Sequence, residues 1–146
     1  MDAWAALMLV SGGAFAGGAA TFSWSRVPIW RTMDLAPFAD DFSATIHRTD
    51  KVQPALLVVA ILSAIAYALT ADGSASALAW VGAGGLIVTL AASVAVLVPL
   101  QRRIIAQAPA RPSAVEEMRR RWFRGHLGRS VLSMSSFVSL ALAATV

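Results

Sequence analysis

The longest uncharged stretch of the chain runs from Gly73 to Gln101 and reads GSASALAWVGAGGLIVTLAASVAVLVPLQ. An α-helix rises about 1.5 Å per residue, so these 29 residues exceed the roughly 20 that cross the hydrocarbon core of a bilayer. Three more uncharged stretches lie at residues 3–25, 52–71 and 130–146. Lipid offers no hydrogen bonds to unpaired backbone groups, so such stretches are expected to be helical. The pattern predicts four transmembrane helices, at residues 3–25, 52–71, 77–100 and 127–146.

The composition also indicates a membrane protein. Hydrophobic residues make up 58% of the 146 residues and charged residues only 14%, whereas soluble domains have about 45–50% and 25%. The chain has no cysteine, which excludes disulfides, thiolate zinc sites and iron–sulfur clusters. We therefore expect one all-α domain over residues 1–146, an integral membrane four-helix bundle.

The basic residues predict the topology. All twelve Lys and Arg lie in or beside the segments that join the first helix to the second and the third to the fourth. The positive-inside rule makes that side cytoplasmic, so both termini face outward from a multi-pass protein of the inner (plasma) membrane. The basic excess is then suited to anionic lipid headgroups. Nucleic acid is not an expected partner, because no basic segment is free of a membrane helix.

Two helical features are expected on the cytoplasmic side. Residues 34–48 are predicted to form a short interfacial helix between the first two spans, since Phe38, Phe42 and Ile46 repeat every four residues on one face. The fourth helix is expected to begin well before its span and to extend into the cytoplasm.

Small residues in the spans indicate close helix packing, because apolar burial drives little association in lipid. The first helix contains Gly13-x-x-x-Gly17, and the third contains Gly82 and Gly85. These faces are expected to meet partners within the bundle. The first could also form a homodimer or contact a larger membrane complex.

A polar stripe enters the membrane along the fourth helix. Its members are spaced 4, 3, 4 and 3 residues apart, which places them on one face: Trp122, His126, Arg129, Ser133 and Ser136. The second helix has a weaker counterpart in Gln53, Ser63, Tyr67 and Thr70. Facing one another, the two stripes would line a pocket for an apolar small molecule. Alternatively, the serines bond their own helix backbone, and Arg129 and Trp122 are interfacial anchors.

The two histidines, His47 and His126, both fall at the predicted cytoplasmic membrane edge. Imidazole is suited to proton transfer near neutral pH, and Arg129 could stabilise a resulting oxyanion. A metal held by His47 and His126 with a nearby aspartate is a weaker interpretation, so no metal and no cofactor is predicted. Each histidine could also simply form hydrogen bonds among the headgroups. No dinucleotide, phosphate-loop, zinc-protease or hydrolase motif is present.

The pattern Arg121-Trp122, His126 and Arg129, followed by an apolar helix rich in Ser, Leu and Ala, resembles the C-terminal signature of the anthrone oxygenase-like family. The resemblance extends to Pro28, Phe42 and Val98-Pro99. It implies a small four-helix membrane protein, oxygenation of an activated aromatic methylene to a ketone by molecular oxygen, and no bound organic cofactor.

The resemblance implies functional roles for Trp122, His126 and Arg129, and we add His47 from its location alone. After Val98-Pro99, where the family favours asparagine before the next loop, this chain has Gln101, which we assign to the substrate pocket with Tyr67, Ser63, Ser133 and Ser136. Two other classes of function stay open. One is a non-catalytic subunit of a membrane complex, and the other is a module that binds lipid or a small molecule without chemistry.

Overall fold

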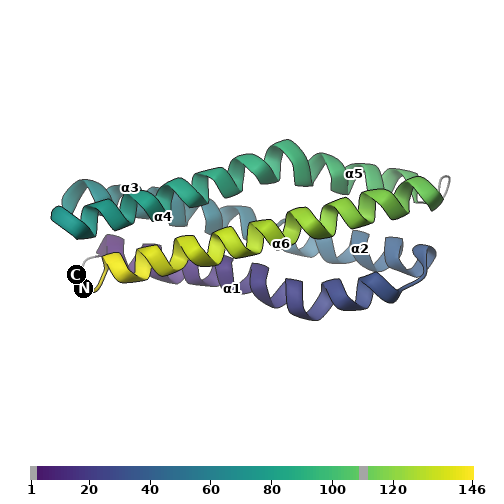
Figure 1. Cartoon of the computed structure of the whole chain (residues 1–146), viewed down its shortest axis with the longest axis horizontal. Helices are drawn as coiled ribbons and strands as arrows, with labels where there is room; N and C mark the ends of the chain where they lie inside the picture. The colour runs from purple at the N-terminus through teal and green to yellow at the C-terminus, as the bar shows by residue number, and fades with distance from the viewer. Residues whose placement is uncertain (1–2, 109–111) are drawn as a thin grey trace.

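The computed structural model describes residues 3–108 and 112–146, and the regular structure in these ranges is entirely helical. The elements are α1 (Ala3–Thr32), α2 (Leu35–Thr49), α3 (Gln53–Thr70), α4 (Gly73–Ala92), the π-helical segment η1 (Ser93–Leu97), α5 (Val98–Gln107) and α6 (Pro112–Ala143). Because α4, η1 and α5 follow one another without a break, and α2 leads into α3, the chain forms four long rods (Figure 1).

The rods form a closed bundle. Along one half of its length α1 packs against α3, α3 against α4, α4 against α6, and α6 against α1. Along the other half α2 and α5 contact each other and α6. The start of α1, the end of α6 and the connection between α3 and α4 lie at the same end of the bundle (Figure 1). Because the chain runs along the bundle four times, it ends on the side where it began.

Three helical stretches are long and apolar enough to cross a membrane: Ala3–Thr32, Leu35–Thr70 and Gly73–Gln107. Large apolar side chains on them, such as Leu62, Val81 and Val94, are exposed, as expected for a surface that contacts lipid. The fourth predicted span, at residues 127–146, forms the C-terminal half of α6 and is not among the three. Arg129 and the serines of this segment lower its mean hydropathy.

Glycines bring α4 close to α6, as the sequence predicts. A Cβ atom added at Gly85 would meet Ser136 Oγ at 2.2 Å, and one at Gly82 would meet Leu140 Cδ2 at 2.5 Å. Gly13 packs inside the bundle, where an added Cβ would lie 3.2 Å from the Phe137 ring, whereas Gly17 has no such neighbour within 4 Å.

The apolar face of α2 packs into the protein. Phe38 and Phe42 are fully buried against Trp30 of α1 and against Trp122 and Phe123 of α6, with ring centroids 5.0–6.3 Å apart for the pairs in contact. These five rings form what we call the aromatic cluster. A helix is therefore present where one is predicted at residues 34–48, and its apolar side stabilises the end of the bundle, whereas its interfacial position stays a prediction.

Arg119 closes the C-terminal end of α1. Its Nη1 donates to the carbonyl oxygens of Trp30 at 3.0 Å and Met33 at 2.7 Å, and its Nη2 pairs with Glu116 at 2.5 Å. The last carbonyls of a helix have no partner within that helix. The buried guanidinium supplies donors to two carbonyls at this end of α1 and ties α1 to α6.

The π-helical segment η1 lies midway along the α4–α5 rod. Pro99 follows it by two residues, lacks an N–H group and would clash with a carbonyl one turn earlier in a regular helix. A wider π turn relieves this clash, and such turns are frequent at functional sites. Leu97, the last residue of η1, faces the interior at this level.

Candidate functional site

A cavity of about 220 Å³ lies where all four rods meet beside the aromatic cluster. Its walls come from α1, from the junction of α2 and α3, from the η1–α5 segment and from α6. The lining residues are Gly18, Ala19, Phe22, Ile46, Thr49, Asp50, Gln53, Leu97, Gln101, Trp122, His126 and Arg129. Cavities of roughly 150 Å³ bind benzene, so this volume suits a molecule somewhat larger than benzene.

Two parallel rings form one wall. The imidazole of His126 stacks on the indole of Trp122 with centroids 4.8 Å apart and planes inclined by 7°. Phe22 of α1 meets the imidazole edge-on, with centroids 5.2 Å apart. His126 and Trp122 are each 2% exposed. Their spacing of four residues places both on one face of α6, and the stack fixes the orientation of the imidazole.

Unpaired polar atoms converge on this cavity. Among the described residues, the buried side-chain nitrogen and oxygen atoms without a hydrogen-bonding partner are Gln53 Oε1, Trp122 Nε1, His126 Nδ1, His126 Nε2 and Arg129 Nε. Every one of them belongs to a residue that lines the cavity. An unpaired buried polar group costs about 1–3 kcal/mol, so the group of them indicates a site built to be filled.

The backbone near His126 does not satisfy its ring. The Ala19 carbonyl beside the imidazole accepts a hydrogen bond from Ser130 Oγ at 3.1 Å. The contact between that carbonyl and His126 lacks hydrogen-bond geometry. A neutral imidazole has one N–H donor and one lone pair, so both remain free for a bound molecule.

Opposite charges face one another across the cavity. Arg129 and Asp50 interact electrostatically, yet no salt bridge joins this described pair. Arg129 also places its guanidinium carbon 5.8 Å from the centroid of the Phe15 ring. Asp50 lies in the short connection between α2 and α3 and is exposed, so it marks the side on which the cavity approaches the surface.

Gly18 permits the close approach of Gln53. A Cβ atom at position 18 would lie 2.5 Å from Gln53 Nε2. The amide therefore occupies the space that a side chain on α1 would fill, and its Oε1 is left as an unpaired acceptor beside the cavity.

The structure brings together four of the residues assigned to the site from the sequence. Trp122, His126, Arg129 and Gln101 all line the cavity. His47 is exposed on α2 and does not line it.

The other predicted pocket residues lie elsewhere in the bundle. The hydroxyls of Ser63, Ser133 and Ser136 donate to carbonyls one turn earlier in their own helices, at 2.6 Å, 2.6 Å and 2.8 Å. Tyr67 Oη donates to the Ala143 carbonyl at 2.9 Å and joins α3 to the end of α6. None of these four residues lines the cavity.

Gln53, which sequence reasoning placed on the polar stripe of the second helix, also lines the cavity. Sequence reasoning did not assign Gly18, Phe22 or Asp50 to the pocket. Within residues 3–108 and 112–146, no group of three or more His, Cys, Asp or Glu side chains is placed to hold a metal ion.

The fold and the site together define a small all-α protein with membrane-type helices and a buried aromatic cavity that carries unpaired polar groups. The family model for anthrone oxygenase matches residues 42–139, and the chain belongs to that family. The match includes Asp50, Gln53, Gln101, Trp122, His126 and Arg129, whereas the α1 wall of the cavity precedes it. Searches of curated proteins and of solved structures return no significant match.

Proposed function

We propose that this protein oxygenates a flat, apolar aromatic substrate with an activated methylene, using molecular oxygen within the cavity beside Trp122 and His126. Family membership supports this reaction class. The observation that carries the proposal is the convergence of the unpaired buried polar atoms on one aromatic-walled cavity. An apolar pocket with a few convergent polar groups is the usual form of a small-molecule site.

His126 is the proposed base. Its free ring nitrogen takes a proton from the methylene carbon, and the electron pair of that C–H bond moves into the aromatic system as an enolate-type anion. The N–H groups of Arg129 and Trp122, at Nε and Nε1, are unpaired and able to donate to the resulting oxyanion. Gln53 Oε1 is an acceptor suited to a substrate hydroxyl.

The anion then reacts with oxygen. A C–O bond forms and the oxygen is reduced to a hydroperoxide, which takes up the proton. The second methylene C–H bond and the O–O bond then break, leaving a ketone and one molecule of water. The carbon is oxidised by the same oxygen molecule that is reduced, so the balance needs no further electron donor.

The membrane arrangement is part of the proposal. We propose four crossings, with the end that holds α2, α5 and the start of α6 on the cytoplasmic side and both termini outward. The support is the location of the basic residues and the apolar exteriors of the rods. The cavity then lies near the inner edge of the hydrocarbon core, where an apolar substrate arrives from lipid.

The test is oxygen uptake by the purified protein in lipid nanodiscs, with an anthrone as substrate and the uncatalysed rate subtracted. We expect one oxygen consumed per ketone formed. Replacing His126 by Gln should lower turnover by about 10²–10⁴-fold, the usual contribution of a positioned base. Thr89→Val is the matched control, because Thr89 is equally buried but bonds its own helix and does not line the cavity.

Two results would overturn the proposal. Turnover that is equal in wild type and His126→Gln, with both proteins folded, would remove His126 as the base. Tight binding of the anthrone to the wild type without oxygen uptake would favour a module that binds a small molecule and performs no chemistry.

A further inference from the structure

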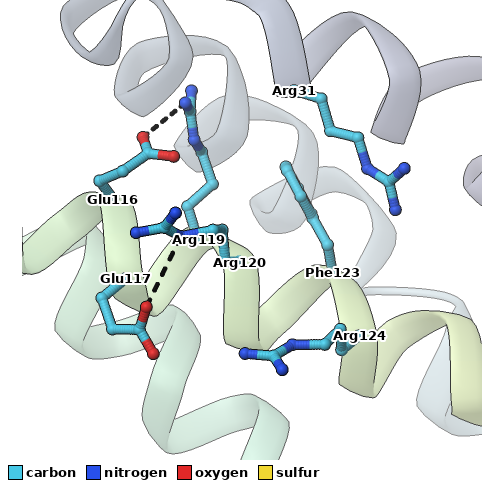
Figure 2. Close-up of a pocket in the computed structure, with 7 residues that line it drawn as sticks. All are labelled: Arg31, Glu116, Glu117, Arg119, Arg120, Phe123 and Arg124. Atoms are coloured by element: carbon cyan, nitrogen blue, oxygen red, sulfur yellow. Dashed lines mark ion pairs between the residues drawn. The ribbon is translucent and has the colours of Figure 1, made fainter.

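A second depression lies beyond the aromatic cluster, between the end of α1 and the first turns of α6. It is an open basin of about 640 Å³ around Phe123, and it shares no residue with the cavity. Figure 2 shows its rim, where Arg31 reaches in from α1 while Arg120 and Arg124 project from α6. Arginines outnumber glutamates in this basin by four to two.

The two glutamates are already engaged. Glu116 pairs with the buried Arg119, which also holds the carbonyls at the end of α1. Glu117 accepts from Arg121 Nε at 2.8 Å and lies 3.6 Å from Arg120 Nε. The hydrogen bond from Arg121 lowers the pKa of Glu117, which therefore stays ionised and committed to its arginines.

Neither Arg31 nor Arg124 forms an ion pair with a carboxylate among the described residues, although Arg124 lies near enough to Glu117 to contribute to lowering its pKa. Both arginines are exposed. Arg31 holds its guanidinium carbon 5.9 Å from the centroid of the Phe123 ring, a contact that uses one face of the guanidinium and leaves its N–H edges free. Two guanidinium groups that form no ion pair border one basin, and their N–H edges are suited to an anion with several oxygens.

The level of the basin along the bundle indicates the source of the anion. Arg124 precedes the predicted span at residues 127–146 by three residues, about 4.5 Å of helix, and Arg31 lies about 9 Å beyond the end of the predicted span at residues 3–25. The headgroup layer of one leaflet is about 5–8 Å thick. Arg124 therefore lies at the level of the lipid phosphates, and Arg31 lies just beyond that layer, from where its long side chain can reach back to it.

We propose that this basin binds the phosphate of an anionic phospholipid, held between Arg31 of α1 and Arg124 of α6. Bound in this way, the lipid bridges the two helices that flank the cavity. The inference depends on the proposed membrane position but not on the oxygenase chemistry, so an inactive protein with the proposed orientation would leave it standing.

Native mass spectrometry of the purified protein tests the proposal, with phosphatidylglycerol as the probe and phosphatidylcholine, a zwitterion of zero net charge, as the comparison. The variant is Arg31→Gln/Arg124→Gln. The matched control is Arg48→Gln/Arg103→Gln, which removes two exposed arginines from the same half of the bundle but outside the basin. We expect the apparent affinity for phosphatidylglycerol to fall by about tenfold or more in the variant and by less than about twofold in the control.

Three outcomes would overturn the inference. Equal losses in the variant and the control would mean that the lipid responds only to overall charge. Equal retention of phosphatidylcholine and phosphatidylglycerol by the wild type would remove the anionic requirement. Binding of inorganic phosphate without retained phosphatidylglycerol would assign the basin to a soluble anion. Should the double variant fold poorly, Arg124→Lys keeps the charge but loses the planar fork, and we expect it to bind phosphatidylglycerol with intermediate affinity.

Discussion

The indole of Trp122 and the imidazole of His126 lie parallel, one turn apart on α6, with centroids separated by 4.8 Å and planes inclined by 7°. The chain contains only two histidines, and the other, His47, is exposed. The two rings are therefore in very different magnetic surroundings, which gives a direct check on the site.

In a proton–carbon NMR spectrum of protein labelled in its imidazoles, we expect one histidine signal at ordinary shifts and one moved upfield by the indole ring current. His126→Gln should remove the shifted signal, and Trp122→Leu should return it towards the ordinary position. Two unshifted signals in the wild type would contradict the stack.

Replacing Gly18 by Ala should impair ligand binding more than folding. The new Cβ would lie 2.5 Å from Gln53 Nε2, the far end of a flexible side chain, so the amide is displaced into the cavity at small cost in stability. We expect KM for the anthrone to rise several-fold with the unfolding midpoint nearly unchanged. Gly17→Ala is the control, because nothing lies within 4 Å of its added Cβ. Equal kinetics in the two variants would argue against a role for Gly18 in shaping the site.

Neighbouring glycines on α4 should respond in opposite ways to alanine. At Gly85 the added Cβ would lie 2.2 Å from Ser136 Oγ, so this hydroxyl must turn away from the Leu132 carbonyl to which it donates, or α4 and α6 must separate, and we expect a loss of about 1–3 kcal/mol in the free energy of unfolding. At Gly84 nothing lies within 4 Å, and alanine should be neutral or stabilising. Unfolding of both variants in mixed micelles measures the difference. A stable Gly85→Ala would show that the helices are not in close contact there.

Arg119→Gln should destabilise the half of the bundle that contains α2 and α5. The change removes donors from the Trp30 and Met33 carbonyls and leaves Glu116 without its partner, at a cost of about 2–4 kcal/mol. Arg121→Gln breaks an exposed pair with Glu117 and should cost less than about 1 kcal/mol. The same unfolding assay compares the two. Similar losses in both variants would mean that the buried arginine contributes no more than a surface ion pair.

The helical rods could be predicted from the sequence because their signal is local. Uncharged length alone predicts a helix at residues 52–71, close to the observed α3 (Gln53–Thr70). The rod that contains Gly73–Gln107 extends beyond the span predicted at residues 77–100, and its last turns carry Arg102 and Arg103, so uncharged length does not predict them. Apart from Pro99, no residue in the sequence indicates the π-helical segment η1.

The site could be predicted only in part, because spacing gives a face of a helix but not the depth at which a cavity opens. Ser133 and Ser136 share a face with His126 and Arg129, yet they lie farther along α6. There both side chains are buried, and each hydroxyl donates to a carbonyl of its own helix. Gly18 and Phe22 come from a helix distant in sequence, and only the tertiary contact of α1 with α6 brings them to the cavity.

The start of α1 and the end of α6 lie at the same end of the bundle, so both can carry reporter fusions (Figure 1). Complementary halves of a split fluorescent protein, attached to the two chain ends, would be close enough to assemble within a single copy. The opposite end, with its arginine-rimmed basin, would stay unobstructed, so brightness would report insertion and folding while lipid and substrate experiments proceed on the same sample.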